Sequence, residues 1–379
     1  MTTTKRFMLA TVIFLSAWGP AGVLISPALA HGTGSGSSTG AMALLIFPAA
    51  AILFGLFLVF THEKKGWTVL VTGGAGYVGS ALVPELLRRG HSVVLLDLYP
   101  HGDDVFNAFH GYENLREVKG DIRDQPTLEL ALKGCDGVIH LAHLSDGLSP
   151  DRDSTKSVNH DAFGPLVRAA RKAGVKRFMY ASSFRVYGDR GGAEATEDLP
   201  LAPAGADAKD KAFCEQVLTE ERVSGFVTCT VRPGAVCGDG PGRRHDNIVS
   251  TFAKAAIDQG QIRVLGGNRK HPFIHIDDMV AFYLFLLNQP DIRIDGRAFN
   301  ACTENLTYLE LAKVVKNVAG GDISIDLEPA DEPYACHLST DRMRHQLGFV
   351  PTRGVEDAVR DRIAALRKSA DLPRHEAAS

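Results

Sequence analysis

Charge of either sign is missing from the first part of this chain. Between Arg6 and Glu63 there is no Asp, Glu, Lys or Arg, although charged residues make up 22% of the 379 residues. Over the whole chain the acidic and basic residues nearly balance, and the formal net charge is −3. A chain with this charge balance does not produce the strong positive field that non-specific nucleic-acid binding requires. We therefore expect no nucleic-acid partner, and an apolar N-terminal part followed by a charged body.

Spacings typical of metal sites are also missing. The six cysteines all lie in the charged body, and no two of them are spaced C-x-x-C. The histidine pairs His140/His143 and His271/His275 have no cysteine partners at zinc-binding spacing. We therefore expect no metal site, and reduced thiols of the kind found in the cytoplasm.

The N-terminal part begins with a pattern that has two interpretations. In residues 1–30, Lys5 and Arg6 precede an apolar stretch that ends in Ala-Leu-Ala. This pattern is typical of a secretory signal peptide, and a first transmembrane helix is the alternative. Residues 31–40 are rich in Gly and Ser and are expected to be a flexible linker.

A second apolar run, at residues 41–61, is long enough to cross a membrane. It contains no charged residue, and twenty helical residues span about 30 Å, the thickness of the bilayer hydrocarbon. Lys64 and Lys65 follow it, whereas the linker before it has no Lys or Arg. Because basic flanks stay on the cytoplasmic side, we expect a transmembrane helix in the cell (inner) membrane with the body facing the cytoplasm.

The body opens with a strand, a glycine-rich turn and a helix. Residues 67–72 are apolar and β-branched, and Gly73, Gly76 and Gly79 follow at a spacing of three. Such glycines permit a tight turn and let backbone N–H groups approach a pyrophosphate at the helix N-terminus. A second apolar strand ends at Asp97, where a carboxylate can accept hydrogen bonds from a ribose and repels a 2′-phosphate. The pattern predicts a dinucleotide site that favours NAD over NADP.

Apolar strands and helical segments alternate along the rest of the body. This alternation predicts an α/β fold with a Rossmann-type, doubly wound parallel sheet, whose ligands bind at the carboxyl ends of the strands. We expect residues 66–240 to form the NAD-binding domain, residues 241–370 mainly a smaller substrate-binding subdomain, and residues 371–379 a tail.

From Trp67 to about Arg367 the chain resembles the NAD-dependent epimerase/dehydratase family. The members of this family are extended short-chain dehydrogenases/reductases that act on nucleotide sugars. The resemblance implies NAD as cofactor and a nucleotide-diphosphate sugar as partner. The membrane lipid bilayer, and other membrane-complex subunits or a second copy in a homodimer, are further expected partners. The motifs that carry it stand in the family's order and are VTGGAGYVGS, GDIRD, VIHLA, ASSFRVYG, VRPGAVCG, HPFIHIDDM and LGFVPTRGVEDAV.

The resemblance also implies roles for single residues. Asn159 resembles the helix asparagine that supports the site, and Arg243, Arg244 and Arg269 either meet a diphosphate or are solvated loop charges. The residues implied to bind the cofactor are Gly73, Gly76, Tyr77, Val78, Gly79, Asp97, Asp121, Ile122, Ala142 and Lys211.

The implied catalytic group departs from the family at one position. The family uses a Ser or Thr after the fifth strand and a Tyr-x-x-x-Lys, in which the ammonium lowers the pKa of the phenol. Ser183 and Lys211 match, but Asp207 stands where the tyrosine is required. Asp207 is a weaker base than a phenolate and is expected to form an ion pair with Lys211. Tyr180 and Tyr187 lack a lysine four residues later and do not restore the motif.

Two functions therefore remain open. The first is a membrane-anchored, NAD-dependent nucleotide-sugar epimerase or dehydratase in which Ser183, Asp207 and Lys211 are catalytic. The second is a catalytically silent NAD(P)-binding accessory subunit of a membrane complex.

Overall fold

The structure, a computed structural model, describes most of the charged body. The segments predicted at residues 1–30, 31–40 and 41–61, and all but the first residue of the predicted tail, lie outside the described residues. In the described part, no helix is both long enough and apolar enough to cross a bilayer. The described residues belong to one compact unit and are 66–99, 111–144, 152–242, 247–330 and 335–371.

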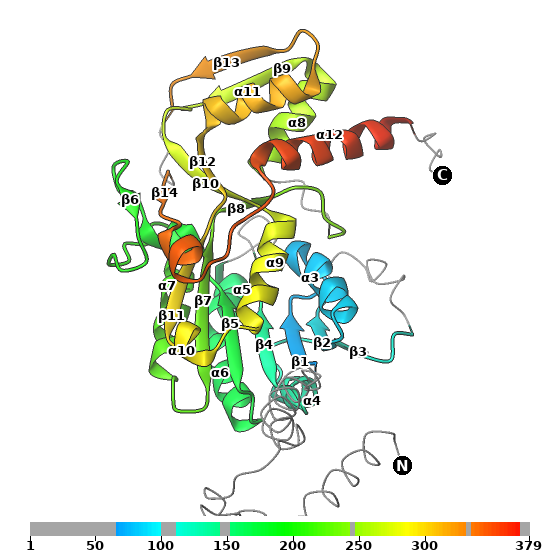
Figure 1. The fold of residues 1–379 in the computed structure, drawn as a ribbon, viewed down its shortest axis with the longest axis vertical. Coiled ribbons are helices and arrows are strands. Elements are labelled where there is room, and N and C mark those ends of the chain that lie inside the picture. Colours follow the sequence, from blue (N-terminus) through cyan, green and yellow to red (C-terminus); the bar gives the residue numbers. More distant parts are fainter. Residues whose placement is uncertain (1–65, 100–110, 145–151, 243–246, 331–334, 372–379) are drawn as a thin grey trace, which may run out of the picture. The chain divides into compact units, whose positions relative to one another are not determined.

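A seven-stranded sheet is the centre of this unit (Figure 1). All of its strand pairs are parallel, and the strand order runs outward in both directions from β1 and β4. This doubly wound order confirms the predicted Rossmann-type sheet. In spatial order the strands are β3 (Leu115–Lys119), β2 (Ser92–Asp97), β1 (Thr68–Thr72), β4 (Gly137–His140), β5 (Arg177–Ala181), β7 (Val227–Pro233) and β11 (Arg297–Ala301).

Helices cover both faces of the sheet because successive side chains of each strand point to opposite faces. Val69 and Val71 of β1 pack in the core that contains α3 (Tyr77–Arg88) and α9 (Ile276–Leu287). Leu70, between them, packs in the core of the other face. The helices of that second face are α4 (Gln125–Leu132), α6 (Phe163–Lys172) and α7 (Ala206–Glu220).

A second layer of smaller sheets and helices is built mainly from the later part of the chain. Its core lies between helices and two small sheets, and α11 begins with a capping box formed by Thr307 and Glu310. Its main elements are β8 (Ala235–Cys237), α8 (Ile248–Gln259), β9 (Gln261–Leu265), β10 (Lys270–His275), β12 (Glu304–Thr307), α11 (Tyr308–Ala319), β13 (Ser324–Glu328) and α12 (Val355–Asp371).

Several short elements lie between the longer ones along the chain. β6 and β14 pair with each other in parallel, although more than 140 residues separate them in the chain. The short elements are α5 (Arg152–Lys156), η4 (Ser157–Asp161), η5 (Phe184–Tyr187), β6 (Glu194–Ala195), α10 (Asp291–Ile294), β14 (His337–Leu338) and η6 (Arg342–Gln346).

The chain returns to the large sheet after the domain boundary predicted at residue 240. α9 packs against the same face of the sheet as α3, and β11 pairs with β7 as the last strand. Residues on both sides of 240 therefore build the cofactor half.

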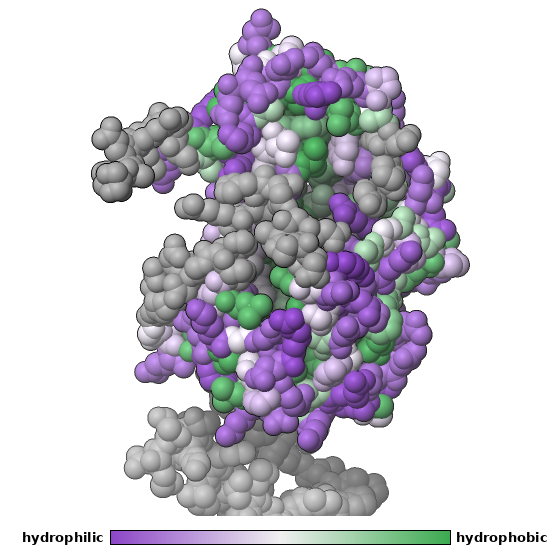
Figure 2. All heavy atoms as spheres, turned by 180° about the vertical axis from the view of Figure 1, so that it is seen from behind, coloured by the Kyte–Doolittle hydropathy of each residue, from purple (hydrophilic) through white to green (hydrophobic). Residues whose placement is uncertain are grey.

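On the face shown in Figure 2, polar side chains predominate and apolar ones are scattered in small groups.

Candidate active site

The glycine-rich turn after β1 packs closely against the end of β4. Gly73 has φ +70°, and a Cβ on it would lie 2.6 Å from the backbone nitrogen of Ala142. A Cβ on Gly79 would lie 2.4 Å from the carbonyl oxygen of Gly73. Packing inside the protein therefore requires glycine at both positions. A Cβ on Gly76 would meet only the Gly73 oxygen, at 3.2 Å, so this position faces open space.

The N-terminus of α3 is suited to bind an anion. Gly76 is its N-cap residue, and no side chain caps the first turn. Uncapped N–H groups and the positive end of the helix dipole attract phosphate groups. The turn lies at the carboxyl ends of β1 and β4, where the strand order reverses and dinucleotides bind in doubly wound sheets. These features fit the pyrophosphate of NAD.

Asp97 and Asp121 lie at the carboxyl ends of two neighbouring strands, β2 and β3. Asp97 ends β2, and its Oδ1 accepts a 2.8 Å hydrogen bond from the backbone N–H of Tyr99. Asp121 is held by the guanidinium of Arg123, whose hydrogen bonds lower the pKa of its carboxyl group. Ile122 beside it is buried. Asp97 lies next to the glycine-rich turn, because its other oxygen accepts a hydrogen bond from the N–H of Ala75. The side chain of Asp121 already has a charged partner.

The segment after β8 crosses the beginning of α3. The hydroxyl of Tyr77 donates a 2.7 Å hydrogen bond to the carbonyl of Gly238, and the N–H of Gly242 donates one of 2.7 Å to Ser80 Oγ. Val78 packs into the sheet core on the same side as α3. Tyr77 and Val78 thus fix the helix start from two sides.

Ser183 and Lys211 both lie near the end of β5. Ser183 is the N-cap of η5, and its Oγ accepts a 3.2 Å hydrogen bond from the N–H of Arg185. The buried ammonium of Lys211 donates a 2.8 Å hydrogen bond to the carbonyl of Ala181, the last residue of β5. Burial lowers the pKa of Lys211, although nearby carboxylates, Asp207 first, oppose that shift. The two predicted residues therefore lie at one strand end.

Asp207 contacts a histidine, and the ion pair expected with Lys211 is not among those of the described residues. Its Oδ1 lies 2.6 Å from Nε2 of His143, which follows β4 and Ala142. The expectation fails because Lys211 points to the carbonyl of Ala181 instead. Burial alone would raise the pKa of Asp207, but His143, Lys211 and Arg185 together lower it to about 2. Asp207 is therefore ionised at neutral pH.

Asn159 fixes the backbone next to His143, in agreement with its implied supporting role. Its amide accepts a 2.8 Å hydrogen bond from the N–H of Leu144 and returns one of 2.8 Å to the carbonyl of Leu144. The thiol of Cys214 on α7 donates to the backbone carbonyl of Asn159 at 3.1 Å. Asn159 therefore links α7 to the chain that carries His143.

Neither of the two nearby tyrosines replaces the missing phenol. Tyr180 is buried in the core behind β5, and burial raises its pKa well above the ordinary value. Tyr187 is also buried; its hydroxyl donates to Asn300 and accepts from Arg232, and burial raises its pKa to about 12. Both phenols remain protonated, and the hydroxyl of Tyr187 is engaged in hydrogen bonds elsewhere.

Of the three arginines considered for a diphosphate, one is described. Arg269 pairs with Asp189, and its Nη1 donates a hydrogen bond of 2.9 Å. Arg243 and Arg244 lie outside the described residues. The ion pair of Arg269 agrees better with a loop charge than with a free anion ligand.

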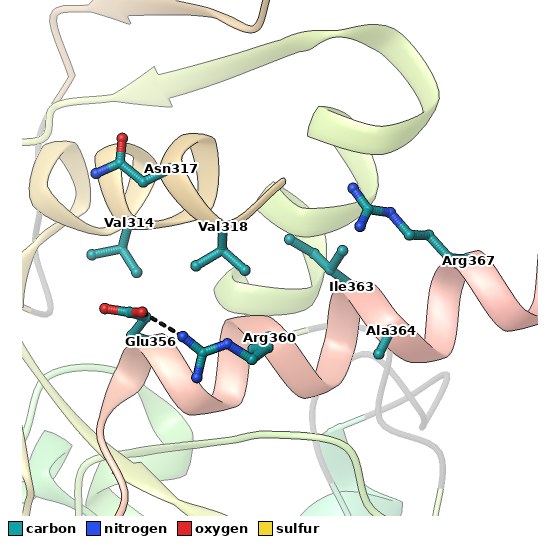
Figure 3. Close-up of a pocket in the computed structure, with 8 residues that line it drawn as sticks. All are labelled: Val314, Asn317, Val318, Glu356, Arg360, Ile363, Ala364 and Arg367. Carbon is teal, nitrogen blue, oxygen red and sulfur yellow. Dashed lines mark hydrogen bonds and ion pairs between the residues drawn. The ribbon is translucent and has the colours of Figure 1, made fainter. Parts of the chain in front are cut away.

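Two cavities in the described part lie apart from these strand ends. One, of about 430 Å³, is bounded by α11 and α12, with Val314, Val318 and Ile363 facing its interior (Figure 3). The other, of about 470 Å³, is lined by Glu215, Arg232 and residues near the outer strand β11. No predicted cofactor or catalytic residue lines either cavity.

Sequence reasoning missed His143 as a site residue and considered it, together with His140, only as a possible metal ligand. The signal that could have found it is its position in VIHLAH, directly after Ala142. Its partner Asp207 is 64 residues away in the sequence, so only the fold brings the two together.

Comparisons with known proteins agree with this geometry. Residues 69–302 match the model of the NAD dependent epimerase/dehydratase family, which confirms the prediction of NAD as cofactor. A 3 beta-hydroxysteroid dehydrogenase/Delta 5→4-isomerase of Mycobacterium tuberculosis is 31% identical over 271 residues, covering 66% of this chain and 69% of the relative. A dTDP-glucose 4,6-dehydratase of Streptomyces niveus is 29% identical over 315 residues, covering 77% and 90%. The solved structure of MoeE5 in complex with UDP-glucuronic acid and NAD has a TM-score of 0.69 and 26% identity, covering 80% of this chain and 99% of that one.

Proposed function

The chain belongs to the NAD dependent epimerase/dehydratase family, and we propose that it is an active enzyme that oxidises a hydroxyl of a nucleotide sugar. The observation that carries the proposal is the meeting of three features at the carboxyl ends of β1, β4 and β5. These are the uncapped glycine-rich turn, the hydroxyl of Ser183 and the buried ammonium of Lys211.

Each of these groups has a role in the proposed site. The turn around Gly76 and the start of α3 would hold the pyrophosphate, and Asp97 the ribose next to it. NAD, when bound, supplies the acceptor for a hydride from a sugar carbon. The hydroxyl oxygen of Ser183 accepts a hydrogen bond from the backbone N–H of Arg185, so its hydrogen is available to donate to a sugar oxygen. Lys211 uses one donor on Ala181 and has two more for ribose hydroxyls.

Two relatives support a nucleotide sugar as the substrate class. The dTDP-glucose 4,6-dehydratase matches over 90% of its length, and MoeE5, solved with UDP-glucuronic acid, matches over 99%. A 3-beta-hydroxysteroid dehydrogenase of Mycolicibacterium neoaurum is 31% identical and also matches over most of its length, 89%, so coverage does not separate the two substrate classes. We favour the sugar because UDP-glucuronic acid and UDP-glucose are bound in solved structures that match over 99% of their length.

The experiment incubates the full-length chain and NAD with UDP-glucose, UDP-glucuronic acid, dTDP-glucose or a 3β-hydroxysteroid. Products are followed by NMR as an inverted carbon, a 4-keto sugar or a loss of deuterium from a labelled carbon. We expect turnover of at least one nucleotide sugar. Lys211→Met should abolish it, whereas Lys209→Met, an exposed lysine on the same helix, should leave it unchanged.

Two results would contradict the proposal. Turnover of the steroid alone would move the substrate to another class. Tight NAD binding without turnover of any nucleotide sugar would instead support the silent accessory subunit.

We also propose that residues 41–61 anchor the protein in the membrane, with the body on the cytoplasmic side. The uncharged span and the following Lys64 and Lys65 support this arrangement. The full-length chain should sediment with membranes and resist carbonate extraction, while added protease should reach the body only from the cytoplasmic side. Recovery of the full-length chain in the soluble fraction would refute the anchor.

A further inference from the structure

His143 and Asp207 form a close pair at the place where the family has a tyrosine. Nε2 of His143 lies 2.6 Å from Oδ1 of Asp207, and their side chains are only 20% and 23% exposed. Oδ1 is buried and has no other polar partner among the described residues. The imidazole of His143 is therefore the group that faces this carboxylate oxygen.

The fold holds both members of the pair in place. Asp207 and Lys211 are one turn apart on α7, and Cys214 follows on the same helix face. Cys214 donates to the carbonyl of Asn159, whose side-chain amide clamps the backbone of Leu144 next to His143. The helix that carries Asp207 is thereby linked to the chain that carries His143.

The surroundings of the pair favour a neutral imidazole of His143 next to an ionised carboxylate of Asp207. Burial lowers the pKa of His143, Lys211 lowers it further, and Asp207 and Asp210 oppose the shift. Asp207 is ionised, because its pKa is lowered to about 2 despite burial. The charged and titratable groups that face the pair come from α7, β4 and η5 and are Asp210, Lys211, His140 and Arg185.

A neutral imidazole next to a carboxylate has its proton on the nitrogen that faces the carboxylate. Nε2 of His143 then donates to Asp207, and Nδ1 keeps a free lone pair. No hydrogen bond to Nδ1 is present among the described residues. A carboxylate that fixes the tautomer of a histidine and stabilises its protonated form is the arrangement of known histidine bases.

We propose that His143 is the general base of the oxidation and that Asp207 is the positioning residue that holds it. This inference rests on the proposed function. The backbone of Ala142, next to His143, packs against Gly73 of the cofactor turn, and the imidazole lies against Asp207, one helical turn before Lys211. From this position we infer that the imidazole faces the substrate hydroxyl.

In the proposed oxidation, the O–H bond of the substrate breaks and the proton binds to Nδ1 of His143. The electron pair of the O–H bond becomes the second bond of the new carbonyl, while the substrate carbon gives its hydride to the cofactor. The carboxylate of Asp207 stabilises the resulting imidazolium. In epimerisation the ketone is reduced again, and the same proton returns to the oxygen.

Kinetics of the full-length chain test the roles of the two residues. His143→Gln should lower kcat by about 10²- to 10⁴-fold with unchanged NAD affinity, because general base catalysis is lost. Added imidazole should partly restore turnover in His143→Ala. Asp207→Asn should also lower kcat, and it should move the acid limb of the kcat/KM profile to lower pH, since the carboxylate raises the pKa of His143. Asp161→Asn, which removes the carboxylate from an exposed His–Asp pair, is the matched control and should change neither.

A nitrogen NMR measurement reads the pair without any substrate. In protein labelled with ¹⁵N-histidine, the signal that disappears in His143→Gln should be neutral at pH 7 with its proton on Nε2. A proton on Nδ1, or a tautomer and titration unaffected by Asp207→Asn, would overturn the inference. So would full turnover by His143→Gln while the wild type acts on a nucleotide sugar. Absence of wild-type turnover with the Nε2–H tautomer present would instead refute the proposed function.

Discussion

The carboxylate of Asp97 accepts a 2.9 Å hydrogen bond from the backbone N–H of Ala75 in the glycine-rich turn. Its other oxygen accepts from the N–H of Tyr99. Asp97 therefore joins the end of β2 to the turn after β1, and it places a negative charge beside the predicted ribose position. We therefore expect the shape of the turn and the choice of cofactor to depend on the same side chain.

Replacing Asp97 with Asn should weaken NAD binding and narrow the preference for NAD over NADP. The amide keeps one acceptor oxygen for the turn but removes the charge that repels a 2′-phosphate, and charge-assisted hydrogen bonds are about twice as strong as neutral ones. Calorimetric titration of wild type and variant with both dinucleotides measures the change. Equal losses for NAD and NADP would show that Asp97 does not lie at the ribose.

Replacing Gly76 with Ala should weaken NAD binding by about tenfold, or about 1.4 kcal/mol, without unfolding the protein. The new Cβ meets only the Gly73 oxygen, at 3.2 Å, and otherwise fills the space that a pyrophosphate needs. Gly164→Ala on α6 is the matched control, because its Cβ also has a nearest contact of 3.2 Å, with the flexible end of Arg168. NAD affinity should fall only in the first variant, and an equal fall in both would contradict the model of the site.

The parallel sheet and the cofactor turn could be predicted from local sequence patterns. Apolar β-branched runs such as residues 67–72 occupy buried strands, and the close contacts of Gly76 and Gly79 are with Gly73 and Gly74, within a few residues. These features are local, so the sequence contains all the information that they need.

The partners of the catalytic groups could not be predicted because they are set by packing between distant segments. Local spacing suggested that Asp207 pairs with Lys211 one turn later, but Ala181 at the end of β5 offers Lys211 a buried carbonyl instead. That leaves Asp207 to His143, which another strand brings within contact distance. The return of β11 to the sheet edge beyond residue 240 is likewise a tertiary pairing, with β7.

Replacing Glu215 with Ala should lower the free energy of unfolding by about 3–5 kcal/mol, because it leaves a buried guanidinium without its partner. Nη2 of Arg232 lies 2.6 Å from Oε2 of Glu215, and the two side chains are only 7% and 8% exposed. Urea denaturation measures the loss. In the exposed pair of Arg263 and Glu328, Glu328→Ala should cost about 1 kcal/mol or less. Similar losses in the two variants would contradict the prediction.

The folded protein should lose stability as the pH falls below 6.5, in part because of His140. This histidine is buried next to Thr72, and burial, with the charges of Lys211 and His143, lowers its pKa from 6.5 to about 3. The unfolded chain therefore binds a proton that the folded protein excludes, which costs up to about 1.4 kcal/mol per pH unit between these values. Unfolding measured from pH 7 to pH 4 should show a shallower slope for His140→Asn. An unchanged slope would mean that His140 also takes up its proton in the folded state.

Replacing Asp207 with Tyr should move the role of general base from the imidazole of His143 to the phenolate of the new tyrosine. The substitution restores Tyr-x-x-x-Lys on α7, and a phenol has an ordinary pKa of about 10 that the nearby ammonium of Lys211 lowers. Because the wild-type base is the imidazole of His143, whose pKa lies below 6.5, the acid limb of kcat/KM should move to higher pH in Asp207→Tyr. In that background, His143→Gln should cost much less than the about 10²- to 10⁴-fold expected in the wild type, since the base has changed. Equal losses from His143→Gln in both backgrounds, with NAD affinity retained, would show that residue 207 and His143 do not share one catalytic role.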